Sequence, residues 1–122
     1  MLDHIVLNVS DIGRSRAFYE AALAPLELEI VADYGEFLGF GRQDRPFFWI
    51  AQREPHHHGV HVAFAASRRA VVDDFHAGAL SAGGRDNGSP GLRQQYSPDY
   101  YGAFVFDPDG NNIEAVCHAA ED

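Results

Sequence analysis

The sequence contains no lysine, one cysteine and one tryptophan among 122 residues, and each scarcity limits what the protein can be. A single cysteine, Cys117, excludes an intrachain disulfide and a cysteine-rich zinc module. All nine basic residues are arginines, opposed by eighteen Asp and Glu, and the formal net charge is -9. An acidic chain with dispersed arginines suits neither nucleic acid nor an anionic membrane surface, so we predict neither as a partner.

Long apolar runs are also missing from the sequence. No stretch approaches the roughly 20 apolar residues that a transmembrane helix needs. The opening residues Met1 to His4 lack the basic and apolar regions of a signal peptide. Hydrophobic residues still make up 46% of the chain, which is enough for a packed core. We therefore expect a single cytoplasmic domain over residues 1–122.

The first half alternates between strand-like and helix-like patterns. Residues 2–9 predict a strand that is buried on at least one face. Residues 12–23 carry apolar side chains at helical spacing, after the N-cap candidate Ser10-Asp11. Pro25 ends this helix, because the residue before a proline avoids helical backbone angles. Three β-like runs follow at residues 26–33, 34–41 and 46–52.

The second half repeats this order after a connector at residues 53–59. The pattern predicts a strand at 60–65, a helix at 67–83, and strands at 101–106 and 112–118 joined by a tight turn at 107–110. A short strand around 85–95 is expected only by symmetry with residues 26–33. Tyr34-Gly-Glu-Phe37 resembles Tyr101-Gly-Ala-Phe104. We predict two βαβββ modules, about 1–54 and 59–118, in one domain, since each half alone has too small a core.

Three polar residues, His4, His61 and Glu114, stand within otherwise apolar strands. Glu114 is the clearest case, because a carboxylate in such a strand must be neutral, paired or bound to a cation. Two imidazoles and one carboxylate form the facial triad used for Fe(II), while Mn(II), Zn(II) and Ni(II) are also chemically possible. Each residue taken singly is better interpreted as a hydrogen-bonded core side chain. Their repeat-related positions favour one shared metal site.

Four segments resemble a known family. They are the opening Leu2-Asp-His-Ile-Val-Leu-Asn-Val-Ser-Asp11, the helical Ser15-Arg-Ala-Phe-Tyr-Glu20, His61-Val-Ala-Phe64, and the ending Asp107-Pro-Asp-Gly-Asn-Asn-Ile-Glu114. Together they resemble the glyoxalase/bleomycin-resistance/extradiol dioxygenase family, also called the vicinal oxygen chelate superfamily. The resemblance implies an α+β fold in which two βαβββ modules form a half-open mixed β-barrel with helices outside. It also implies one divalent metal ion, with Fe2+ favoured, on His4, His61 and Glu114.

The sequence departs from this family at one position. Glyoxalase I enzymes take a fourth ligand, normally a glutamate, from the last strand of the first module. Here the corresponding position is close to Trp49, while Gln52 lies toward the strand end and Glu54 beyond it. Three protein ligands look more like the extradiol dioxygenases or the fosfomycin-resistance transferases. A chain without lysine fits the cationic phosphonate pocket of the transferases poorly, and bleomycin-binding members lack the metal ligands altogether.

The resemblance therefore implies a metal-dependent enzyme that chelates adjacent oxygens of a small organic substrate, with dioxygenase-type chemistry favoured. Lyase, isomerase or thiol-transferase chemistry is the second option. A non-catalytic small-molecule binding or resistance protein on the same fold is the alternative from another class, because one fold hosts many reactions.

Further side chains are predicted around the metal. Tyr101 is the predicted catalytic residue, as an acid or orienting donor to an oxygen on the metal, with packing on the barrel rim as its alternative. Trp49, Phe48 and Tyr100 are predicted to contact a flat or apolar substrate, with core packing as the alternative for such aromatic residues. Arg93 is predicted to meet a substrate carboxylate, with a place in a solvated loop as its alternative. The histidine tract at residues 56–58 is expected at the surface.

The resemblance also bears on assembly. Related small proteins of this family are commonly dimers, and several build the metal site across the interface. We therefore expect a homodimer with C2 symmetry. We favour sites shared between chains, with His4 from one chain and His61 and Glu114 from the other, slightly over sites within one chain.

Overall fold

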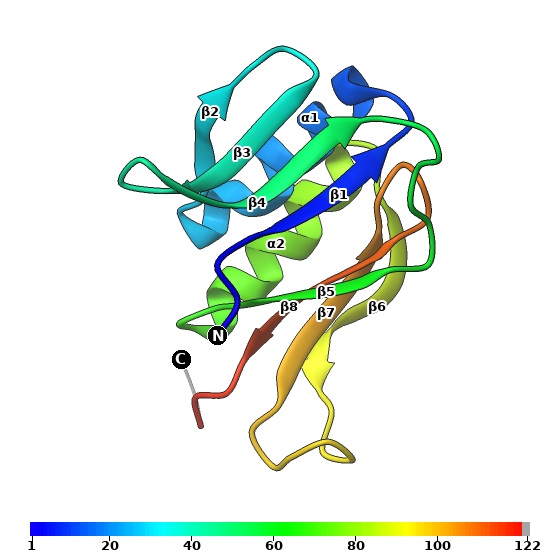
Figure 1. Cartoon of the computed structure of the whole chain (residues 1–122). Helices are drawn as coiled ribbons and strands as arrows, with labels where there is room; N and C mark the ends of the chain where they lie inside the picture. The colour runs from blue at the N-terminus through cyan, green and yellow to red at the C-terminus, as the bar shows by residue number, and fades with distance from the viewer. Residues whose placement is uncertain (121–122) are drawn as a thin grey trace.

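The computed structural model describes residues 1–120, which form two successive βαβββ units. The first unit contains β1 (Ile5–Val9), α1 (Ile12–Leu23), the 3-10 turn η1 (Ala24–Leu26), β2 (Glu29–Asp33), β3 (Phe37–Arg42) and β4 (Arg45–Gln52). The second contains β5 (His61–Ala65), α2 (Arg69–Ser81), β6 (Arg85–Leu92), β7 (Tyr101–Phe106) and β8 (Asn112–Cys117). Figure 1 shows their arrangement.

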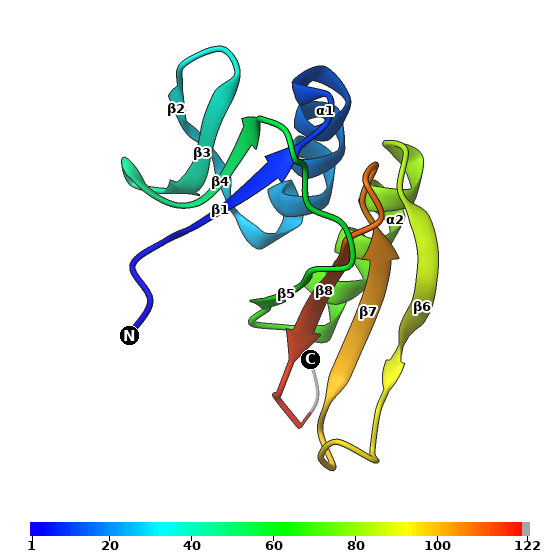
Figure 2. The ribbon, with the colours of Figure 1, turned by 45° about the vertical axis from the view of Figure 1, so that its right-hand side comes forward.

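Each unit forms its own four-stranded sheet. The strand order is β1-β4-β3-β2 in the first sheet and β5-β8-β7-β6 in the second. Within each sheet the first strand runs parallel to the last strand of its unit, and the other pairs are antiparallel. The predicted α+β fold of two βαβββ modules is confirmed. The two sheets of one chain remain separate, as Figures 1 and 2 show, and they close no barrel.

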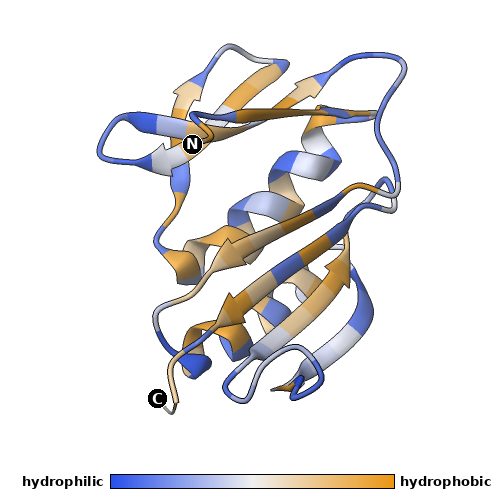
Figure 3. Ribbon diagram, turned by 60° about the horizontal axis from the view of Figure 1, so that its bottom comes forward, coloured by the Kyte–Doolittle hydropathy of each residue, from blue (hydrophilic) through white to orange (hydrophobic). Residues whose placement is uncertain are grey.

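Strand alternation places one face of each sheet against the helices. In β1, Leu7 and Val9 are buried while Val6 is exposed. In β8, Ile113 and Ala115 are buried against the helices, together with Cys117. The colours of Figure 3 show the same alternation of apolar and polar residues along the strands. We call the covered side of each sheet its helix face and the opposite side its open face.

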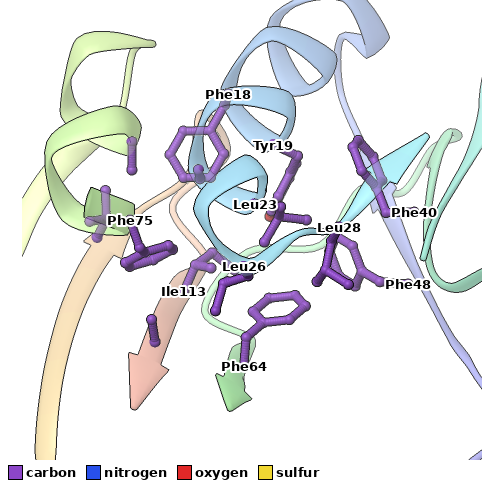
Figure 4. Packing of buried hydrophobic residues seen from close by; sticks show 14 of the residues in the cluster. Phe18, Tyr19, Leu23, Leu26, Leu28, Phe40, Phe48, Phe64, Phe75 and Ile113 are labelled. Atoms are coloured by element: carbon purple, nitrogen blue, oxygen red, sulfur yellow. The ribbon is translucent and has the colours of Figure 1, made fainter. Parts of the chain in front are cut away.

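The two helices join the helix faces into one core. Asp11 caps α1 as predicted, since its carboxylate accepts a hydrogen bond from the Arg14 N–H at 3.0 Å. At the contact between α1 and α2, a Cβ added to Gly78 would lie 2.8 Å from the carbonyl oxygen of Ala21, so only glycine permits this approach. Figure 4 shows Phe64 of the second unit packed among side chains of the first.

The hairpin between β7 and β8 ties the two units together. Asp107, which is only 3% exposed, accepts hydrogen bonds from the Tyr19 hydroxyl at 2.5 Å and from the backbone N–H of Asn111 at 2.8 Å. Asp109 accepts bonds from both the backbone and the side chain of Ser10. Asn111 bonds the connector, accepting from Val60 N–H and donating to the His57 carbonyl. The hairpin thus fixes α1, the connector and the second sheet relative to one another.

Strand pairing gives the correspondence between the two halves. Trp49 pairs with Val6 and Gly39 in the first sheet, and Glu114 pairs with Ala63 and Phe104 in the second. Because His4 and His61 precede Val6 and Ala63 by the same two residues, Trp49 is the counterpart of Glu114, as the sequence indicated. Phe37 then corresponds to Gly102. The predicted match between Tyr34-Gly-Glu-Phe37 and Tyr101-Gly-Ala-Phe104 is therefore wrong by two residues. Because side chains alternate along a strand, a shift of two residues leaves each residue assigned to the same side of the sheet.

No helix within residues 1–120 has both the length and the apolar character that crossing a membrane requires.

Candidate functional site

A buried carboxylate on the open face of the second sheet is the centre of the candidate site. Glu114 of β8 is 1% exposed, although its side chain points away from the helices. Its Oε1 lies 2.7 Å from Nε2 of His61, whose side chain is 53% exposed. Parallel pairing of β5 with β8 brings the two side chains together, because His61 lies on the same face, two residues before Ala63, the pairing partner of Glu114. The predicted proximity of these two residues is therefore present in one chain.

Tyr100 covers the other carboxylate oxygen of Glu114. Its hydroxyl donates a hydrogen bond to Oε2, and its ring makes edge-to-face contacts with Tyr96 and His118. Burial, followed by the hydrogen bond to Glu114, raises the pKa of Tyr100 to about 12. Gly102 makes room for this contact, since a Cβ there would lie 3.2 Å from the Tyr100 ring and 3.3 Å from Glu114 Oε2. Tyr100 therefore stays protonated and acts as a donor at neutral pH.

Arg93 places a positive charge on the same open face. Its guanidinium lies 5.4 Å from the centroid of the Phe104 ring, and that ring is 6.2 Å from the ring of His61. The guanidinium also donates to the carbonyl oxygens of Ser89 and Gly91, which hold it in position. One sheet face thus combines a buried carboxylate, an imidazole, a phenol and a cation.

His4 lies on the other sheet, apart from this group. It immediately precedes β1, and its Nδ1 lies 2.6 Å from the carboxylate of Asp3. Within residues 1–120 of one chain, no three His, Cys, Asp or Glu side chains gather closely enough to hold a metal ion. A single chain therefore brings together two of the three predicted ligands, His61 and Glu114, and leaves His4 at the start of β1.

A groove separates the facing edges of the two sheets. Its volume is about 470 Å³, and it is lined by residues of β1 and β5 that include Val6 and His61. A smaller groove of about 250 Å³ lies between His4 and residues 62–64. Both predicted histidines thus border the gap between the edge strands.

The predicted substrate-binding aromatics divide between the two faces of β4. Phe48 is 1% exposed and packs edge-to-face on Phe64 with ring centroids 5.3 Å apart, so it belongs to the core and not to the open face (Figure 4). Trp49 takes the open face, where its ring stacks on Phe37 with centroids 4.4 Å apart. Consecutive residues of a strand point to opposite sides, so only one of two adjacent aromatics can reach the open face.

The same alternation corrects the prediction for Tyr101. Its hydroxyl donates to Asp73 on α2 at 2.7 Å, and the guanidinium of Arg69 lies 5.2 Å from its ring centroid. Tyr101 therefore lies on the helix face, away from Glu114, and it cannot supply the predicted proton or hydrogen bond there. Its neighbour Tyr100 occupies that place.

The polar residues near the end of β4 are already engaged in other contacts. Gln52 accepts a hydrogen bond from the Ile12 N–H at 2.9 Å and donates to Glu36 at 3.2 Å. Glu54 bonds His56, and His57 accepts a bond from the Asn8 N–H at 2.7 Å. Neither Gln52 nor Glu54 replaces the missing fourth carboxylate.

Comparison with known proteins identifies the family. The model of the Glyoxalase/Bleomycin resistance protein/Dioxygenase superfamily matches residues 1–115. The chain belongs to this superfamily. The structure of a glyoxalase/bleomycin resistance protein from Albidiferax ferrireducens T118 is 30% identical, covers 98% of this chain and 99% of its own, and superposes with a TM-score of 0.84.

More distant solved structures share the fold. A glyoxalase I mutant from Zea mays is 20% identical, with 94% of this chain and 46% of that chain covered and a TM-score of 0.71. Oxidase ChaP-H2 is 20% identical, with 98% and 95% coverage and a TM-score of 0.69. No curated protein matches the sequence. The fold is therefore shared with a glyoxalase I and with an oxidase.

Proposed function

We propose that the protein is a metal-dependent enzyme in which His4, His61 and Glu114 hold one divalent ion. The observation that carries the proposal is the buried carboxylate of Glu114, paired with His61 on a sheet face that no helix covers. Burying a charge away from water is costly unless it is paired or bound to a cation. Two imidazoles and a carboxylate suit Fe2+ first, and Mn2+, Zn2+ or Ni2+ as alternatives.

The separation of His4 from the other two residues supports a site shared by two chains. Each chain leaves the open faces of both sheets uncovered, and Val6 on β1 is 37% exposed. A C2 homodimer can place the first sheet of one chain opposite the second sheet of its partner. His4 of one chain then completes the ligand set begun by His61 and Glu114 of the other. A second copy of this chain is thus proposed as the partner.

The remaining residues of the open face have roles that follow from their contacts. When bound, the ion supplies Lewis-acid polarisation of adjacent substrate oxygens. Tyr100 donates a hydrogen bond to Glu114 and so fixes the orientation of that ligand. Arg93 offers a positive charge to an anionic group of the substrate, and Trp49 an aromatic surface. Dioxygenase-type chemistry on a small organic substrate is favoured, with lyase, isomerase or thiol-transferase chemistry second.

Metal content tests the ligand assignment. Protein purified without added metal or a histidine tag should contain about one divalent ion per chain by elemental analysis. Glu114→Gln, His4→Ala and His61→Ala should each lose it while the domain stays folded. His76→Ala is the matched control, because His76 pairs with Asp86 on the helix side of the molecule. Metal binding by Glu114→Gln as tight as in the wild type would refute the assignment.

Subunit exchange tests whether the site is shared. His4→Ala and Glu114→Gln proteins are mixed so that they exchange subunits and form heterodimers. If the sites are shared between chains, each heterodimer has one site that lacks both ligands and one site that is intact. Metal binding should then return to about half of the sites in each heterodimer. If each site lies within one chain, every site keeps a defect and nothing returns. A monomer by sedimentation at micromolar concentration would contradict the shared site.

Turnover separates an enzyme from a binding protein. We expect the metal-loaded protein to consume oxygen with members of a catechol panel, and Glu114→Gln to lose this activity. A wild-type protein that takes up no metal, even after reconstitution, would instead favour a small-molecule binding or resistance protein on the same fold.

A further inference from the structure

The position that corresponds to Glu114 in the first sheet carries the only tryptophan of the chain. The ring of Trp49 lies directly over Gly39 of the neighbouring strand β3. A Cβ at Gly39 would lie 2.9 Å from two ring carbons of Trp49 and 2.8 Å from Pro46, closer than side-chain packing allows. Glycine at this position therefore lets the indole lie against the sheet.

Two more rings extend this surface. Phe37 stacks on Trp49 with centroids 4.4 Å apart and planes inclined by 21°. Tyr34 is inclined by only 11° to Trp49 at 6.4 Å, and it is 73% exposed. Near-parallel, offset rings present aromatic faces in one orientation, whereas the core rings of this protein meet at steep angles, as Phe48 and Phe64 do at 84°. We call Tyr34, Phe37 and Trp49 the aromatic platform.

A cation without an acidic partner marks one end of the aromatic platform. The guanidinium of Arg53 lies 5.2 Å from the centroid of the Phe37 ring. Within residues 1–120, only Arg16 and Arg69 form ion pairs with carboxylates, so Arg53, like the other arginines, keeps its charge available to a ligand. An accessible cation beside stacked rings suits a ligand that combines an aromatic ring with a negative charge.

The aromatic platform shares its sheet face with the proposed ligand His4. Trp49 pairs with Val6, and His4 precedes Val6 by two residues, so strand alternation puts both on the open face. A ring that stacks on Trp49 thus lies beside the strand end from which His4 would reach the metal. Phe48 points into the core, whereas Phe47, which is 39% exposed, lines the smaller groove together with His4.

We propose that the aromatic platform is the subsite for a planar aromatic ring of the substrate, and that Arg53 favours a ring bearing a negative charge. This proposal names the substrate class of the site described above. It rests on the proposed function in one respect, because it takes the open face to be part of a substrate cavity. Ring binding itself requires no metal.

Trp49 provides a direct readout, because its emission is the only tryptophan signal. We would titrate the metal-free wild-type protein with 2-naphthoate and with its non-planar, fully saturated counterpart, decahydronaphthalene-2-carboxylate. Emission would locate the binding and calorimetry would measure it. We expect 2-naphthoate to bind more tightly and to change the Trp49 emission. Equal binding of the two probes would overturn the proposal.

Two variants probe the rings separately. Tyr34→Leu removes one exposed ring, and Gly39→Ala displaces the indole. Each should weaken 2-naphthoate binding about 2- to 12-fold, the range expected from loss of one aromatic stacking contact. Tyr34→Leu should fold normally because Tyr34 is largely exposed. Leu80→Ala is the control, since it removes an exposed apolar side chain from α2, and it should leave binding unchanged.

Two further measurements distinguish a ring-binding subsite from a dimer contact and from the metal site. If Tyr34→Leu alters the dimer dissociation constant in sedimentation and leaves probe binding unchanged, a second copy covers the aromatic platform and the proposal is overturned. Titration of Glu114→Gln separates the two proposals. Wild-type 2-naphthoate affinity in that variant supports the subsite even if the metal assignment fails, and metal binding without any ring binding refutes the subsite alone.

Discussion

The hydrogen bond between Tyr19 and Asp107 gives a quantitative test of how the two units are held together. Both residues are almost fully buried, and Tyr19 comes from α1 while Asp107 begins the β7–β8 turn. Tyr19→Phe removes only the hydroxyl. Asp107 keeps its donors from Asp109 and Asn111, so its carboxylate is weakened as an acceptor but not left bare.

The expected loss follows from the charge of the acceptor. A hydrogen bond to a charged group contributes about 1.5–3 kcal/mol, and the remaining donors on Asp107 place Tyr19→Phe near about 2 kcal/mol of unfolding free energy. With a typical urea m-value of about 1–3 kcal/mol/M, the unfolding midpoint should fall by roughly 0.7–2 M. All measurements need one protein concentration, because the proposed dimerisation would add to the measured stability.

Tyr101→Phe is the matched control for this experiment. It deletes the same hydroxyl from a tyrosine whose carboxylate partner, Asp73, is at the surface. Its cost should stay below about 1 kcal/mol, as for a solvent-exposed contact. A midpoint shift for Tyr19→Phe no larger than that for Tyr101→Phe would refute the role assigned to the turn.

Three further changes have defined outcomes. Burial and then the charge of Asp107 raise the pKa of Tyr19 well above its usual value. Above about pH 10 only the unfolded chain therefore ionises this group, and the unfolding free energy should fall by up to about 1.4 kcal/mol per pH unit. Urea titrations at several pH values would measure this slope, which should be less steep in Tyr19→Phe. Phe48→Ala should lower the unfolding free energy by about 3–5 kcal/mol and leave the 2-naphthoate affinity of the folded fraction unchanged. A loss of affinity without destabilisation would show instead that Phe48 contacts the substrate. Gly78→Ala should destabilise by about 1–3 kcal/mol in thermal or urea unfolding, because its Cβ meets the Ala21 carbonyl, and an unchanged midpoint would contradict that close helix contact.

Hydrophobic periodicity predicted most of the fold. The helix predicted at 12–23 has those bounds in the structure, and the two-module order is correct. Strand β6 (Arg85–Leu92) was expected only by symmetry, because it contains Gly88, Pro90 and polar residues with little alternation. The register of its pairing with β7 shifts around Gly88. This segment is therefore a strand because it pairs with β7, and its own sequence lacks the hydrophobic alternation that would predict one.

The face of each strand could not be assigned wherever similar residues are adjacent. Tyr100 and Tyr101 follow one another, as do Phe48 and Trp49, and a shift of one residue exchanges the two faces. Pairing of Tyr101 with Cys117 settles the first case, and pairing of Trp49 with Val6 settles the second. His61 and Glu114 were predictable as neighbours because each is a lone polar residue in an apolar strand. The placement of His4 depends on how the units pack, which local periodicity does not encode.

The turn at residues 107–111 has a consequence for how this protein is recognised. The most specific part of its family resemblance runs from Asp107 to Glu114, yet Asp107, Asp109 and Asn111 use their hydrogen bonds to hold the architecture together. Only Glu114, at the last position of the segment, reaches the candidate site. Family membership and chemical competence therefore depend on different residues of one short segment. A chain in which only Glu114 was substituted would keep the family motif and the fold but lose the proposed metal ligand. Family membership inferred from this segment therefore carries no information about catalytic turnover.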